Sequence, residues 1–303
     1  MTPSSINASL PLILLVVIGF MLRRHGGVVD EFWQHANRLC YYLFLPSLLV
    51  TDLAQARLDF HHAASALTAT TVATVVVGLL ATIICRGLSI QSATMTSVFQ
   101  GSIRFNSYVF LALTSFLFGP TGTAMASLFI APMIIVTSVW SVYVLKSSVG
   151  GSTQLTGSVL LATLGNPLTV SSVIGIALNL ADILPPAPIQ GTLAYLGASA
   201  LPISLLAVGA GLRLDRNNLA VLPVGIACGL KLVVLPLVSV SLLHVLGVDG
   251  FSAKIGLLYG SLPCAASSYV LARQLGGDCK TMATIISAGT VGSMISIPLW
   301  LPV

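Results

Sequence analysis

The chain has 303 residues, of which 56% are hydrophobic and only 7% carry a charge, and its mean hydropathy is +0.99. These values exclude an ordinary soluble domain and indicate a polytopic membrane protein. The net charge of +5 does not indicate nucleic-acid binding, because the basic residues are scattered at the ends of apolar segments. The five cysteines have neither metal nor redox spacing, so we expect no metal and no cofactor.

Apolar segments of the length that crosses a bilayer, about 20 residues, recur along the whole chain. We expect an all-α membrane protein with ten transmembrane helices, numbered here as spans 1 to 10. Their approximate ranges are 6–22, 36–54, 63–85, 91–118, 123–145, 159–181, 189–211, 219–246, 250–275 and 280–302. A polar linker at residues 146–158 separates a first half, 1–145, from a second half, 159–303.

Short identities recur between the two halves at an offset of 156 residues. Pro11 corresponds to Pro167, the Val-Ile-Gly of residues 17–19 to residues 173–175, and the Leu-Pro of residues 45–46 to residues 201–202. An ordered series with one offset indicates an internal repeat. Each half holds five spans, and an odd number inverts the second half relative to the first. The pattern therefore predicts two inverted five-helix repeats.

Polar residues interrupt spans 4 and 9 at their centres. Span 4 contains Gln-Gly-Ser-Ile-Arg-Phe-Asn-Ser-Tyr at residues 100–108, and span 9 contains Gly-Ser-Leu-Pro-Cys-Ala-Ala-Ser-Ser-Tyr at residues 260–269. A proline at position 263 removes a backbone donor and breaks the helix. Interrupted spans in corresponding places of two halves point to the substrate site of a transporter near the bilayer midplane.

Six residues at these interruptions are candidate substrate-binding residues. They are Arg104, Asn106, Ser107, Pro263, Ser267 and Ser268. The asparagine and the serines should stand where the second half of each span begins. Free backbone N–H groups and the positive end of a helix dipole meet there, which suits a carboxylate. The alternative is that these side chains only cap the half-helices.

Two basic residues lie inside spans without a mid-span acidic partner. Arg104 could hold the substrate anion, or it could neutralise the carbonyl groups that end the first half of span 4. Lys231, midway along span 8, could take part in proton coupling. The alternative, which we favour from the sequence, is a fixed internal charge in the place of a sodium ion, bonded to carbonyl groups.

Basic residues favour the cytoplasmic ends of spans. One set of loops carries Arg23, Arg24, Arg38, Arg86, Lys146, Arg213, Arg216, Arg273 and Lys280, whereas the other carries only Arg57 and Lys254. This bias predicts that the first loop and the linker lie in the cytoplasm and that both termini lie outside.

Several motifs in this order resemble the auxin efflux carrier family of bacterial transporters, whose plant relatives are the PIN auxin carriers. The motifs are Asn37-Arg38-Leu39, Leu45-Pro46, Arg104-Phe105-Asn106, Asn166-Pro167-Leu168, Leu201-Pro202, Lys231-Leu232, Leu262-Pro263 and Tyr269-Val270-Leu271-Ala272-Arg273. In one respect the chain departs from the pattern, because Ser267 stands where an asparagine is expected in the second crossover.

The resemblance implies an architecture similar to that of sodium/bile acid symporters and sodium/proton antiporters, with broken helices 4 and 9 that cross. Spans 1, 2, 6 and 7 would form a scaffold, and spans 3–5 and 8–10 a transport domain. The implied substrates are organic anions such as malonate, malate or auxin-like acids. The implied protein is a homodimer in the bacterial inner membrane that works by alternating access of the elevator type.

The sequence disfavours two other function classes. An intramembrane enzyme is disfavoured, because the chain lacks HExxH, GxSxG and paired carboxylates at mid-span. A channel is disfavoured because opposed broken spans suit alternating access. Among carriers, a sodium-coupled organic anion symporter of the bile acid type is the main alternative, although the absence of mid-span acids argues against it.

Overall fold

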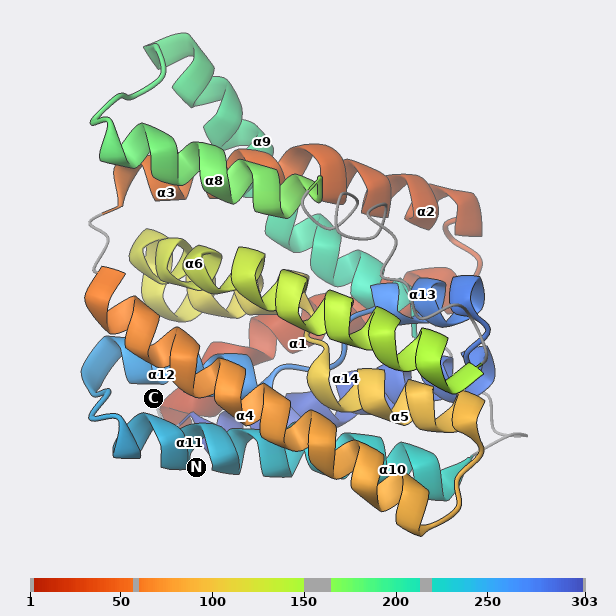
Figure 1. Ribbon diagram of the computed structural model, residues 1–303. Helices are drawn as coiled ribbons and strands as arrows, with labels where there is room; N and C mark the ends of the chain where they lie inside the picture. Colours follow the sequence, from red (N-terminus) through yellow and green to blue (C-terminus); the bar gives the residue numbers. More distant parts are fainter. Residues whose placement is uncertain (1–2, 57–59, 150–164, 213–219, 302–303) are drawn as a thin grey trace.

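The computed structural model describes residues 3–56, 60–149, 165–212 and 220–301. Within these ranges the chain forms helices and no strand, and the helices run in roughly one common direction in a layered bundle (Figure 1). Most of the expected linker, together with Arg57, Arg213 and Arg216 of the charge pattern, lies outside the described residues.

The first half contains α1 (Pro3–Arg24), α2 (Asp30–Leu39), the π-helix η1 (Cys40–Phe44), α3 (Leu45–Gln55), α4 (Phe60–Gly87), α5 (Ser92–Ile103) and α6 (Ser107–Val149). The second half contains α8 (Pro167–Leu180), α9 (Ala187–Ala210), α10 (Val221–Gly229), the π-helix η2 (Leu230–Val234), α11 (Leu235–Val245), α12 (Gly250–Ser261), α13 (Ser267–Leu275) and α14 (Cys279–Trp300).

Among the described residues, five stretches are long and apolar enough to cross a bilayer. They are Ala63–Gly87, Ser92–Val149, Ala187–Ala210, Val221–Val245 and Cys279–Trp300. The second stretch holds two expected spans, because Gly119 turns the chain with a positive φ of 63°, which glycine tolerates. The chain is therefore a multi-pass membrane protein with several apolar membrane-spanning helices.

The two π-helical turns each precede a Leu-Pro pair, at Leu45-Pro46 and at Leu235-Pro236. A proline has no N–H to donate to the carbonyl group four residues earlier, so the regular hydrogen-bond ladder fails there. At η2 the carbonyl oxygen of Leu232 accepts a hydrogen bond from Nε1 of Trp300 at 2.8 Å instead. The widened turn is thus a consequence of local sequence, and a distant indole satisfies the carbonyl that it leaves free.

Glycines bring α1 and α9 into backbone contact. A Cβ atom added at Gly19 would overlap the carbonyl oxygen of Leu206, and one added at Gly209 would overlap the carbonyl oxygen of Val16. A similar contact joins α8 to α3, where a Cβ at Gly175 would lie 2.7 Å from Cβ of Leu53. These close approaches hold α1, α3, α8 and α9 together as one group.

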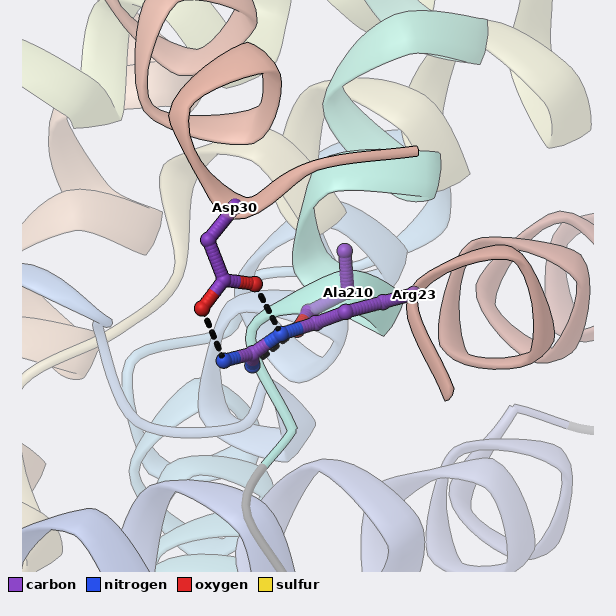
Figure 2. Close-up of polar contacts among 3 residues, drawn as sticks. All are labelled: Arg23, Asp30 and Ala210. Carbon is purple, nitrogen blue, oxygen red and sulfur yellow. Dashed lines mark hydrogen bonds and ion pairs between the residues drawn. The ribbon is translucent and has the colours of Figure 1, made fainter. Parts of the chain in front are cut away.

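Arg23 joins the ends of α1, α2 and α9 (Figure 2). Its Nε donates to Oδ1 of Asp30 at 2.7 Å, and its Nη1 donates to the carbonyl oxygen of Ala210 at 2.7 Å. The second bond satisfies a carbonyl group at the C-terminal end of α9, where a positive charge is also favoured by the helix dipole. The first loop is thereby fixed to the end of α9.

Candidate functional site

The two interruptions seen in the sequence meet in space. Residues 104–106 separate α5 from α6, and residues 262–266 separate α12 from α13. The backbone N–H of Asn106 donates to the carbonyl oxygen of Pro263 at 2.9 Å, and the thiol of Cys264 faces the carbonyl oxygen of Gln100 at 3.7 Å. Residues about 160 positions apart therefore form one centre inside the helical bundle.

The two interruptions have different local causes. A residue before proline is forced into an extended conformation, and Leu262, which precedes Pro263, has φ −68° and ψ 149°. Arg104 has nearly the same conformation, with φ −75° and ψ 147°, but no proline follows it. The second interruption thus follows from its own sequence, whereas the first depends on contacts with the rest of the protein.

Asn106 caps the N-terminus of α6. Its Oδ1 accepts hydrogen bonds from the backbone N–H groups of Tyr108 at 3.0 Å and Val109 at 3.3 Å. These bonds satisfy two of the donors that a helix start leaves free. The capping role that the sequence offered as an alternative is therefore present, and it occupies the side-chain oxygen of Asn106.

Arg104 is buried at this centre, with 9% of its surface exposed. Its Nη2 donates to Oγ of Ser267 at 2.9 Å and its Nη1 to Oγ of Ser138 at 3.4 Å. Its Nε has no partner among the described residues. The bonds go to hydroxyl groups and not to the carbonyl groups at the end of α5, so the described partners leave the positive charge of Arg104 uncompensated.

The N-terminus of α13 is open on one side. The residue that precedes it, Ala266, makes no side-chain cap bond, and Ser267 is exposed. Further exposed residues follow at helical spacing, namely Val270, Arg273 and Gln274. Because serine, arginine and glutamine are poorly suited to contact lipid tails, this face of α13 is suited to contact water.

Two hydrogen bonds join four of the six candidate residues in pairs, Asn106 with Pro263 and Arg104 with Ser267. Ser268 is fully buried, and its Oγ lies 3.5 Å from Sγ of Cys264. Ser107 is half-buried at the start of α6. Ser107 and Ser268 are not joined to the other four by side-chain hydrogen bonds among the described residues.

Three residues near Arg104 were missed by the sequence reasoning. Ser138 lies on the second part of α6, and Tyr41 on η1 lies within electrostatic range of Arg104. Tyr108 in turn lies near Tyr41. Both tyrosines are half-buried and carry hydroxyl donors. The only sequence signal for Tyr108 was its place in the polar stretch, and none existed for Ser138 or Tyr41.

Lys231 lies on η2 with 1% of its surface exposed. Its Nζ is 5.7 Å from the centroid of the Tyr259 ring and has no hydrogen-bond partner among the described residues. Within the same described ranges, no group of three or more His, Cys, Asp or Glu residues is placed to hold a metal ion.

Comparison with known proteins gives two findings. A family model described as Membrane transport protein matches residues 4–301. An uncharacterized transporter of Methanothermobacter thermautotrophicus is 26% identical over 311 residues, which covers 98% of this chain and 97% of the relative. Both matches extend over nearly the whole chain and therefore include both interruptions.

Proposed function

Because the chain belongs to the Membrane transport protein family, that of the auxin efflux carriers, we propose that it is a secondary transporter of a small organic anion such as malonate, malate or an auxin-like acid. Its family makes it a transport protein and not an enzyme. The observation that carries the anion proposal is Arg104, a buried guanidinium with only hydroxyl partners where the two interruptions meet.

The substrate carboxylate would bind between Arg104 and the start of α13. The buried Nε of Arg104 has no partner among the described residues, and the exposed Ser267 accepts from Nη2 of the same guanidinium. A charge-assisted hydrogen bond in a site shielded from water is roughly twice as strong as a neutral one. The positive end of the α13 dipole adds to the attraction. The hydroxyl groups of Tyr41 and Tyr108 would contact the remainder of a small substrate.

We also propose the inverted-repeat architecture, in which the broken spans 4 and 9 cross. Span 4 consists of α5 and the first part of α6, and span 9 consists of α12 and α13. The support for this architecture is a pair of equivalent contacts: Gly19 of α1 packs against α9, and Gly175 of α8 packs against α3. The two glycines are related by the 156-residue offset, so exchanging the two halves converts one contact into the other. The scaffold would consist of α1, α2 with α3, α8 and α9. The remaining helices would form the transport domain, which moves as an elevator.

The exposed face of α13 supports a direction of opening. It leads from Ser267 to Arg273 near the C-terminal end of the helix. Arg273 belongs to the basic residues that the charge bias places in the cytoplasm. We therefore propose that this conformation is open to the cytoplasm. We further propose that the protein is a homodimer of the bacterial inner membrane and that both termini lie on the periplasmic side.

Substrate binding can be tested on purified protein with a thermal-shift screen of malonate, malate and an aromatic acetic acid. A ligand that binds only the folded state raises the unfolding temperature. The uncharged amide of each acid is the matched control. A carboxylate that stabilises the protein more than its amide supports the proposal, and a screen in which no acid exceeds its amide contradicts it. Uptake into liposomes with and without sodium then separates this carrier from a sodium-coupled symporter.

The direction of opening can be tested by cysteine labelling. With cytoplasmic access, Ser267→Cys should react quickly with a charged thiol reagent in inside-out vesicles and slowly in right-side-out vesicles. The buried Ser268→Cys is the matched control and should react slowly in both. Faster reaction of Ser267→Cys from the periplasmic side would contradict the proposed orientation.

A further inference from the structure

The side-chain nitrogen of Lys231 is enclosed by helices that contain no acidic residue. The elements packed against η2 are α4, α5, α10, α11, α12 and α14. Not one of them contains an Asp or Glu. Nζ of Lys231 has no hydrogen-bond partner among the described residues, and the side chain is 1% exposed. A fixed structural charge bonded to carbonyl groups, the interpretation that the sequence favoured, does not fit this arrangement.

The titratable groups that face Lys231 are few. Tyr259 of α12 presents its ring, with the centroid 5.7 Å from Nζ. The thiol of Cys264 is within electrostatic range of Lys231, and Cys228 of α10 is within range of Cys264. The other titratable residues of the packed helices lie toward helix ends. They are His61, His62, Cys85 and Arg86 on α4, His244 on α11, Lys254 on α12, and Cys279 and Lys280 on α14; α5 has none.

These surroundings favour an uncharged amine. An ammonium group with no acid and no hydrogen-bond acceptor costs far more to bury than a neutral amine, and a buried group in that position gives up its charge. The ring of Tyr259 offsets only part of this cost. A lysine that is uncharged when enclosed and charged when reached by water is a place where a proton can be bound and released.

Lys231 also lies close enough to the candidate substrate site to sense an anion there. Cys264 is within electrostatic range of both Arg104 and Lys231, so the two basic residues lie near the same non-helical segment. Positive charges on both Arg104 and Lys231 would repel each other in a medium of low dielectric constant. An anion bound to Arg104 would remove that repulsion and make a positive charge on Lys231 less costly.

We propose that Lys231 is a proton-binding site that couples proton and anion movement. The amine binds a proton from the open aqueous side through its nitrogen lone pair, becomes an ammonium group as the anion binds to Arg104, and releases the same proton on the other side. Proton and anion travel in the same direction. The coupling to an anion rests on the proposed function, whereas the uncharged state of the enclosed amine does not.

The charge state can be measured directly, because the chain has only four lysines, Lys146, Lys231, Lys254 and Lys280. Replacing the other three by arginine leaves Lys231 as the single lysine, and its ¹⁵N-labelled side chain is observed by NMR on the purified protein. The expected signal at about pH 7.5 is that of an amine, whereas an ordinary lysine, with a pKa of about 10.4, gives an ammonium signal there. An ammonium signal from Lys231 overturns the proposal. The Lys231→Met variant identifies the signal by removing it.

The coupling is measured in liposomes that contain a pH-sensitive dye, with malonate as the probe. Malonate uptake by the parent protein should acidify the interior, and Lys231→Met should take up malonate without acidification. The exposed Lys254→Met is the matched control and should behave as the parent does. Equal acidification by Lys231→Met and the parent overturns the coupling. If the parent takes up no malonate, the proposed function fails for that anion, while the NMR experiment still decides the state of the amine.

Discussion

The two interruptions differ in how their second helices begin. At the first, Asn106 caps α6 through its own side chain, and Arg104 brings a positive charge. At the second, Pro263 sets the extended backbone, α13 begins without a side-chain cap, and Ser267 donates or accepts at an exposed position. The first helix start is therefore capped by a side chain, whereas at the second the N–H groups of Ser268 and Tyr269 donate to the backbone carbonyl oxygens of Ala265 and Ala266, at 3.1 and 3.2 Å, beside the exposed face of α13.

In the proposed function, this difference would divide anion binding between the two halves of the chain. The first half would contribute the cation and the second half the exposed Ser267 at the positive end of the α13 dipole, and the Arg104–Ser267 bond of 2.9 Å joins them. In the proposed architecture, the two halves would thus contribute different chemical groups to one site. The following experiments test that division.

The largest effect is expected at the cation. Arg104→Gln removes the charge and one charge-assisted hydrogen bond, which contributes about 1.5–3 kcal/mol, so binding of the best carboxylate from the screen should weaken roughly 10- to 150-fold. Arg104→Lys should retain part of the affinity, because the charge remains and the forked geometry does not. Calorimetry measures both. Unchanged affinity in a well-folded Arg104→Gln variant would show that α13 and Ser267 hold the anion alone.

The next effect concerns the proline of the second interruption. Pro263→Ala keeps the carbonyl group that accepts from Asn106, but it frees Leu262 from its extended conformation and restores a backbone donor. We expect α12 to lengthen, the start of α13 to move, and uptake to fall while the amount of folded protein is unchanged. Pro202→Ala, which alters a proline inside α9 and outside the site, is the control. An equal loss of uptake in both variants would mean that these two prolines affect uptake only through folding.

A smaller effect separates the two helix starts by stability. Asn106→Ala removes a cap worth about 0.5–2 kcal/mol and should lower the unfolding temperature by about 2–4 °C per kcal/mol. Ser267→Ala removes no helix cap, and water can replace its hydroxyl at this exposed position, so it should destabilise the protein less than Asn106→Ala does but should weaken anion binding. Ser107→Ala serves as the control for α6. A Ser267→Ala variant that is as destabilised as Asn106→Ala would contradict the assignment of the cap.

The smallest effect is expected at Asp278, which lies outside the membrane-spanning stretches and links α5 to the start of α14. Asp278 caps α14 by accepting from the N–H of Thr281 at 3.0 Å, and it also accepts from Oγ1 of Thr94 in α5 at 2.9 Å. Burial raises the pKa of Asp278, but the hydrogen bonds from Thr281 and Thr94 outweigh it and hold the pKa below its ordinary value.

A carboxyl group with a lowered pKa stabilises the folded state above its unfolded-state pKa of about 3.9, and it loses that contribution as the pH falls through the folded-state value. Asp278→Asn should therefore lower the unfolding temperature by a nearly constant amount, about 1–3 °C, from neutral pH down to about pH 5. The difference from the parent should shrink only below about pH 4. A difference that already shrinks between pH 8 and pH 6 would assign the effect to another group.

The resemblance to the auxin efflux carriers is confirmed by the family match, and local sequence explains much of the fold that accompanies it. The helix break at Pro263 and the widened turns before Leu45-Pro46 and Leu235-Pro236 follow from the chemistry of proline. The capping role of Asn106 follows from its residue type and its place before an apolar run. These features depend on neighbours within a few residues and are therefore readable along the chain.

Other parts of the site depend on packing between distant segments. Which of Ser267 and Ser268 faces Arg104 is set by the rotational phase of α13, and one residue changes that phase by about 100°. The bond from Arg104 to Ser138 joins α6 to the first interruption across 34 positions of sequence. The position of Tyr41 near Arg104 depends on how η1 lies relative to the segment between α5 and α6. No local pattern encodes these contacts.

The glycine contact between α1 and α9 has a mechanical consequence. Where Gly19 and Gly209 bring backbone against backbone, no side chain lies between the helices whose rotamers could rearrange to absorb a displacement. A shift of one helical turn, about 5.4 Å, would replace each glycine by a larger residue at the point of contact and force the axes apart. The interface should therefore be stiff on the time scale of a transport cycle. A moving substrate site would have to slide along other surfaces, while this pair of helices keeps its register.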